Sequence, residues 1–209
     1  MKGGKVEVMG EGLIFYFVSW CVWVVVTFLM AKTRERFLAG LFLLVLIISS
    51  NESVAIFHFR FSLTAIIITC VCIAILINRK KVVYPTFASI IVSIGYAGML
   101  LWETVVPVWV VMPRLILLSL LCYILLYFLV ESMMVRLAIW GFGSVFGEFI
   151  YSMVVMGYNV SAPIGDAGYL DVLSLVSVIV MLNSAVASVA RTFEQAVLNR
   201  VRRKAGFRS

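Results

Sequence analysis

One carboxylate stands near the centre of a long apolar run. The run, LAIWGFGSVFGEFIYSMVVM, covers residues 137–156, and its only acidic residue is Glu148. A charge in hydrocarbon costs from about 2.5 kcal/mol on insertion scales to about 10 kcal/mol or more in simulations. Glu148 therefore requires a partner, a bound proton or a water-filled pocket, and it is the first residue to consider for chemistry.

Two other polar residues are candidate partners of Glu148. Ser144 precedes it by four positions, so in a helix the two side chains share one face. Asn183 lies in the last apolar run at nearly the same expected depth, among small residues that permit close helix contact. We predict that the sixth and seventh helices touch here and bury a polar network of Glu148, Ser144 and Asn183. The network is either a proton or cation site at which Glu148 titrates, or a neutral, hydrogen-bonded carboxyl that fixes helix packing.

A second pair of opposite charges flanks a single loop. Glu103 follows the fourth apolar run, and Arg114 begins the fifth. We predict that the two side chains form an ion pair across the outer ends of these helices. The alternative is two unrelated charges at the interface, and an exposed pair would contribute about 1 kcal/mol or less.

The sequence contains none of the motifs that identify common enzyme classes. HExxH, GxSxG and GxxxxGK[ST] are all absent, and the four cysteines lie inside apolar runs. With a single histidine, no zinc or haem site can be assembled at convincing spacing. We therefore predict no catalytic residues, no cofactor and no metal site.

The composition indicates a membrane protein. Hydrophobic residues make up 64% of the 209-residue chain and charged residues 13%, with a mean hydropathy of +1.13. A soluble domain has about 45–50% apolar and about 25% charged residues. Unbroken apolar runs favour helices over a β-barrel, whose strands alternate apolar and polar residues. The fold class is therefore all-α, a polytopic integral membrane protein with one membrane domain covering residues 1–209.

Seven transmembrane helices account for the apolar runs. They are expected at about residues 12–31, 37–50, 59–77, 82–102, 114–130, 137–156 and 172–190. Seven crossings leave thirteen of the 17 Lys and Arg residues on one side, which the positive-inside rule makes cytoplasmic. The N-terminus is then outside and the C-terminus inside. A re-entrant hairpin is the alternative for residues 37–50, which are short for a span.

Basic residues between the spans and in the tail suggest a partner at the membrane surface. The tail, residues 191–209, carries apolar residues at four-residue spacing among arginines, which is typical of a short amphipathic helix on an anionic inner leaflet. A solvated topology anchor is the alternative. Nucleic-acid binding is not expected, because no basic face exists outside the junctions.

Several stretches resemble a known family. GLIFYFVSWCVWVVVTFLM at 12–30, KTRERF at 32–37, WETVVPVWV at 102–110 and GEFIYS at 147–152 are similar to the YphA-type membrane proteins of Bacillus and related spore-forming bacteria. The likeness covers nearly the whole chain. It implies a multi-pass protein of a bacterial plasma membrane, in a family without an assigned activity, and it brings no catalytic residues.

Taken together, these patterns favour a structural or accessory component of a bacterial plasma membrane, without catalysis. Its expected partners are the lipid bilayer, anionic lipid at the basic tail and an unidentified membrane protein. The alternative function is a small proton- or ion-coupled transporter in which Glu148 is the titrating intramembrane site. A carrier requires Glu148 to face a water-accessible cavity, whereas an accessory protein can seal it between helices.

Overall fold

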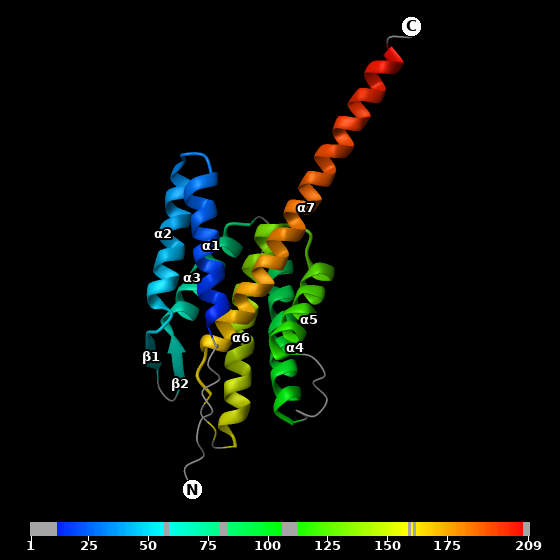
Figure 1. Ribbon diagram of the computed structural model, residues 1–209. Helices are drawn as coiled ribbons and strands as arrows, with labels where there is room; N and C mark the ends of the chain where they lie inside the picture. The colour runs from blue at the N-terminus through cyan, green and yellow to red at the C-terminus, as the bar shows by residue number, and fades with distance from the viewer. Residues whose placement is uncertain are drawn as a thin grey trace.

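Seven α-helices and one two-stranded β-hairpin make up the described part of the chain (Figure 1). The computed structural model describes residues 12–56, 59–79, 83–105, 113–158, 160 and 162–206. The elements in chain order are α1 (Leu13–Leu29), α2 (Arg34–Ser49), β1 (Ser53–Ile56), β2 (Phe59–Ser62), α3 (Leu63–Ile77), α4 (Val83–Val105), α5 (Arg114–Leu129), α6 (Met133–Met156) and α7 (Ala167–Gly206). The mostly helical fold class is thus confirmed.

Successive helices run in alternate directions (Figure 1). The connectors 30–33, 78–79 and 130–132 and the C-terminal part of α7 lie at one end of the bundle, which we call the basic end. The β-hairpin and residues 157–158 and 162–166 lie at the other, which we call the hairpin end. Alternation places Lys32 and Arg79 together at the basic end, as expected when positive connectors stay on one side of a membrane.

Helix α6 lies at the centre of the bundle and packs most closely on α4. Gly143 and Gly147 form the contact: a Cβ atom on Gly143 would lie 3.0 Å from the carbonyl oxygen of Ser89, and one on Gly147 would lie 2.8 Å from that of Ser93. Small residues on both helices therefore let the two backbones approach each other. The glycine pair of α6 faces α4, while α7 packs on another side of α6.

The β-hairpin corrects the all-helical expectation for residues 59–77. Residues 59–62 form β2, which pairs antiparallel with β1 in a register that places Ser53 opposite Ser62. Ser62 N–H donates to the Ile164 carbonyl and Ile164 N–H donates to the Arg60 carbonyl, each at 2.8 Å. The segment before α7 therefore lies along the second edge of β2, and α3 begins only at Leu63.

Three helices are long and apolar enough to cross a membrane by length and composition: α4, α6 and the 167–195 portion of α7. Helices α1, α3 and α5 are apolar but shorter, at 17, 15 and 16 residues. A re-entrant hairpin is the alternative for residues 37–50, and the structure places 37–49 in the single continuous helix α2, with Ser50 as its C-cap.

Helix α7 differs most from its expected bounds. It begins at Ala167, five residues before the predicted start at 172, and it continues through residue 190 to Gly206 without a break. The tail, expected as a separate short helix, is the continuation of α7 and projects beyond the other helices (Figure 1). Residues 207–209 of the predicted tail lie outside the described residues.

Candidate functional site

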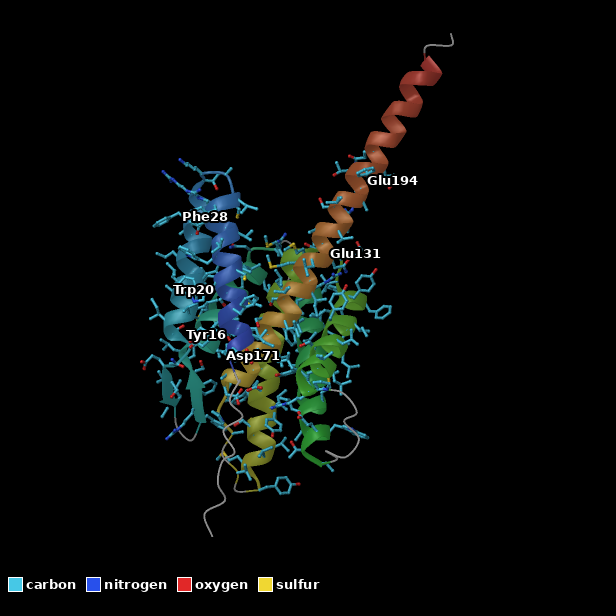
Figure 2. The ribbon with its side chains drawn as sticks, viewed as in Figure 1. Tyr16, Trp20, Phe28, Glu131, Asp171 and Glu194 are labelled. Carbon is cyan, nitrogen blue, oxygen red and sulfur yellow. The ribbon has the colours of Figure 1, made fainter. Side chains whose placement is uncertain are left out.

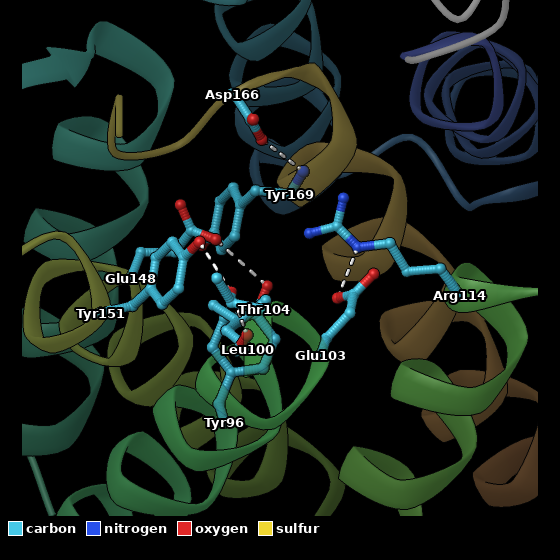
Figure 3. A network of polar contacts seen from close by, with 9 residues as sticks. All are labelled: Tyr96, Leu100, Glu103, Thr104, Arg114, Glu148, Tyr151, Asp166 and Tyr169. Atoms are coloured by element: carbon cyan, nitrogen blue, oxygen red, sulfur yellow. Dashed lines mark hydrogen bonds and ion pairs between the residues drawn. The ribbon is translucent and has the colours of Figure 1, made fainter. Parts of the chain in front are cut away.

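Glu148 lies in the protein interior, on the face of α6 that meets α4. Glu148 is only 7% exposed. The hydroxyl of Tyr96, on α4, donates to Oε1 at 3.3 Å, and the backbone N–H of Gly165 donates to Oε2 at 3.2 Å. Both carboxylate oxygens are thus held by protein groups, one from the segment before α7 and one from a helix, the bond that Figure 3 shows between Tyr96 and Glu148.

Gly165 can reach Glu148 because its backbone adopts a conformation that side chains disfavour. Its φ of +80° lies in the left-handed region, which glycine adopts without steric cost. A Cβ atom at this position would lie 2.8 Å from the Cβ of Ala65 and 3.0 Å from the Cβ of Ser62. Both the dihedral angle and the close packing therefore require glycine, and they turn the N–H toward the carboxylate.

Ser144 lies one helical turn from Glu148 but makes a different contact. Its hydroxyl and that of Tyr169, on α7, are 3.0 Å apart, and Ser144 also donates to the Gly141 carbonyl at 3.3 Å. Trp140 Nε1 donates to the Leu173 carbonyl at 3.2 Å, one turn further along the same interface. These bonds join α6 to α7, while Glu148 joins α6 to α4.

Asn183 does not join this network. Its side-chain amide donates to the hydroxyl of Tyr123, on α5. Because α7 begins at Ala167, Tyr169 occupies the level of Ser144, and Asn183 lies fourteen residues further on, about 21 Å along the helix. The predicted network of Glu148, Ser144 and Asn183 is therefore divided in the structure, and the partners of Glu148 are Tyr96 and Gly165.

Glu103 and Arg114 form the ion pair that their positions suggest. Arg114 Nε and Glu103 Oε2 are 2.9 Å apart, between the ends of α4 and α5 at the hairpin end. The side chains are 26% exposed for Glu103 and 55% for Arg114, so water screens part of the attraction. Figure 3 shows the Arg114 guanidinium between Glu103 and Tyr169, with Glu148 and Asp166 on the far side of Tyr169.

A second buried carboxylate, Asp171, was not among the predicted site residues. It is 4% exposed, and its two oxygens accept from the N–H groups of Gly12 and Phe15, each at 2.8 Å. Asp171, on α7, thus caps the first turn of α1 (Figure 2), where free N–H groups and the helix dipole favour a negative charge. The sequence around Asp171 gives no indication that its partners are Gly12 and Phe15, 159 and 156 residues earlier.

The chemistry open to this arrangement is narrow. No group of three or more His, Cys, Asp or Glu residues that could hold a metal ion occurs among the described residues. Glu148 has a hydroxyl and an amide as its hydrogen-bond partners, neither of which is a base that could activate a nucleophile. The site holds a carboxyl group in place between two helices and a loop.

The helices and the surface identify the class of protein. Large apolar side chains such as Phe28, Val83, Val105 and Phe128 are more than 70% exposed, which is expected when lipid is the solvent. The chain is a helical integral membrane protein.

A family model specifies the class further. The model of the YphA-like integral membrane protein family matches residues 11–206, so the chain belongs to that family. The resemblance carried by the aromatic and aliphatic stretches is confirmed. No curated protein and no solved structure matches the chain.

Proposed function

We propose that the protein is a structural or accessory component of a bacterial plasma membrane and that it has no catalytic activity. The observation that carries the proposal is the closed environment of Glu148, which is 7% exposed and accepts hydrogen bonds on both oxygens. A carrier site must bind its proton or ion from water and release it to water. A carboxyl group sealed between α4, α6 and residue 165 suits a fixed role in helix packing.

The proposed membrane arrangement has seven crossings, with the N-terminus outside and the C-terminus in the cytoplasm. Two features support it: the alternate directions of the helices, and the gathering of Lys32, Arg79, Arg136 and Arg191 toward the basic end. Arg60 and Arg114 are the basic residues of the hairpin end within the described part of the chain. The basic end is then cytoplasmic and the hairpin end extracytoplasmic.

Helix α7 supplies the surface for the proposed partners. Its basic C-terminal portion leaves the bundle, so that Arg191 meets the anionic lipid of the inner leaflet and the residues beyond it extend into the cytoplasm. An accessory protein needs such a surface, because its role is carried out by another protein bound to it. The membrane protein that binds there is unidentified.

Reconstitution separates this proposal from the carrier alternative. The protein and its Glu148→Gln variant are placed in liposomes with an internal pH-sensitive dye, and a proton gradient or a cation gradient is imposed. We expect equal dye responses from both proteins, at the rate of empty liposomes. A proton or cation flux that the wild-type protein supports and Glu148→Gln abolishes would establish the carrier instead.

Affinity capture tests the accessory role directly. The tagged chain is crosslinked in its native membrane, purified and compared with a version truncated after residue 190. We expect a membrane protein to be recovered in stoichiometric amount with the full chain and to be reduced with the truncated one. Recovery of the tagged chain alone from crosslinked membranes would contradict the accessory role.

A further inference from the structure

A cavity of about 350 Å³ lies between α4 and α5 near the hairpin end. Among the described residues, its lining comes from these two helices: Gly95, Gly98, Met99, Trp102, Glu103, Arg114, Leu117, Leu118 and Leu121. Its wall is apolar along the helices, and its two charged residues are the ion-paired Glu103 and Arg114. The cavity is open on one side, where Trp102 is 65% exposed, and an empty apolar groove of this size forfeits dispersion contacts along its walls. In a membrane, a lipid chain is the nearest molecule that can restore those contacts.

Glycines of α4 create the space. A Cβ atom on Gly98 would meet nothing within 4 Å, and one on Gly95 would meet only the Cδ2 atom of Leu125, at 3.1 Å. On the opposite face of α4 the small residues Ser89 and Ser93 are in close contact with α6. Small residues on one face of α4 thus bring α6 close, and on this face α5 approaches at Gly95 but leaves the space beside Gly98 open.

At its polar end the cavity carries one positive and one negative side chain, which complement the charges of a lipid headgroup. Arg114 is 55% exposed, and its bond to Glu103 uses Nε. Among the described residues, neither terminal nitrogen of that guanidinium takes part in an ion pair or hydrogen bond. Figure 3 shows both nitrogens on the side of Tyr169 and Asp166. Guanidinium nitrogens bind phosphate oxygens strongly and often in pairs. Trp102, 65% exposed at the same level, is the residue type enriched where headgroups meet hydrocarbon.

The geometry points to a binding site for one zwitterionic phospholipid with a primary-amine headgroup, of the phosphatidylethanolamine type. Its acyl chain lies in the cavity against Gly95 and Gly98, its phosphate binds the terminal nitrogens of Arg114, and its ammonium binds the carboxylate of Glu103. The pair Glu103–Arg114 carries no net charge, and neither does this headgroup. The other carboxyl groups that act on Arg114 are Asp166 and Glu148, so the site has no excess positive charge to favour an anionic headgroup. An anionic headgroup without an amine has no positive group to bind the Glu103 carboxylate. A quaternary ammonium is positive but has no N–H to donate to that carboxylate.

Native mass spectrometry of the purified full-length protein tests the site. The protein is stripped of lipid in detergent and titrated with phosphatidylethanolamine, phosphatidylcholine or phosphatidylglycerol of identical acyl chains. We expect one phosphatidylethanolamine to be retained about tenfold more strongly than either of the other lipids. That factor corresponds to one charge-assisted hydrogen bond.

Two variants assign the site to this cavity. Gly98→Leu places a side chain in the open space and changes neither residue of the ion pair. It should lower retention about tenfold, the equivalent of losing the contacts of about two buried methylene groups. Glu103→Gln removes the partner of the ammonium and should abolish the preference for phosphatidylethanolamine over phosphatidylglycerol. Cys70→Leu is the matched control, because Cys70 lines a separate apolar cavity between α3 and α6, and it should leave retention unchanged.

Size-exclusion profiles identify the folded variants before any comparison of lipids. Equal retention of the three lipids by the wild-type protein would overturn the proposal. So would a folded Gly98→Leu variant that retains phosphatidylethanolamine as strongly as wild type, because the lipid would then be bound elsewhere.

Discussion

Asp171 ties the first turn of α1 to α7 although the bonded residues are 156 and 159 positions apart in the sequence. Replacing Asp171 by Asn leaves one acceptor oxygen for two buried N–H groups and removes a charge that the helix dipole stabilises. We expect Asp171→Asn to lower the free energy of unfolding by about 1–3 kcal/mol, the cost of one unpaired buried donor. Chemical denaturation of the detergent-solubilised protein, followed by circular dichroism, measures the change.

Asp166→Asn provides the control for that substitution. Asp166 is exposed and accepts one hydrogen bond, from the N–H of Tyr169 at 2.8 Å, at the start of α7. Asn caps helix N-termini about as well as Asp, so this variant should unfold like wild type. Equal stabilities for all three proteins would show that Asp171 does not hold α1 in place.

Gly165 makes the second prediction at this scale. In Gly165→Ala the new Cβ would lie 2.8 Å from the Cβ of Ala65, and the positive φ costs a further ~1–2 kcal/mol. The segment must move, so we expect Glu148 to lose a hydrogen bond and the thermal unfolding temperature to fall. Gly98→Ala, in a helix and in open space, should leave that temperature unchanged or raise it. A Gly165→Ala variant as stable as wild type would contradict the tight fit around this residue.

The sequence was enough to identify Glu148 as a buried polar residue but not to identify its partners. The cost of a charge in hydrocarbon was enough to single out Glu148 and to require a partner for it. The identity of the partner depended on which residue of α7 lies at the same depth in the bundle as Ser144 and Glu148. That depth is set by the residue at which α7 begins. Residues 162–166 fold back beside β2, so α7 starts next to the hairpin and brings Tyr169, rather than Asn183, to the level of Ser144. No pattern of neighbouring residues in the sequence predicts that residues 162–166 fold back beside β2.

At the scale of elements, the contact between α4 and α6 depends on paired small residues. In Gly147→Leu the new Cβ would lie 2.8 Å from the Ser93 carbonyl oxygen, a backbone atom that cannot rotate away. Overpacking of this kind typically costs about 1–3 kcal/mol, and here it also strains the Tyr96–Glu148 bond. We expect the variant to lose much of its monodisperse peak in fluorescence-detected size-exclusion chromatography. Gly98→Leu, the same substitution in open space, should keep it.

The apolar runs located the helices well but misassigned residues 59–62. The motif Phe-Arg-Phe-Ser continues an apolar run, which reads as a helix when only hydropathy is counted. Its alternation is the better guide: Phe59 and Phe61 both lie against Phe149, with ring centroids 5.4 and 6.3 Å away. Side chains two apart share a face in a strand and not in a helix. In this short segment the backbone hydrogen bonds go to β1 on one edge and to Ile164 on the other, and both favour a strand.

At the scale of the whole molecule, the length of α7 exceeds what a bilayer can contain. Forty residues of α-helix extend about 60 Å, whereas the hydrocarbon layer is about 30 Å thick. Helix α7 starts beside the hairpin end, so its second half must emerge at the basic end. Arg191 and the residues beyond it are therefore outside the hydrocarbon, and the membrane protein presents a helical arm on that side.

Single cysteines determine on which side each end lies. Glu52→Cys places a thiol on the exposed hairpin, and Glu194→Cys places one on the exposed arm of α7. With the N-terminus outside, a membrane-impermeant maleimide should label Glu52→Cys in intact cells and Glu194→Cys only after permeabilisation. The wild-type protein is the control, because its four cysteines lie within the apolar helices α1, α3 and α5. Labelling of both positions in intact cells would place the two ends of the bundle on one side, which an odd number of crossings forbids.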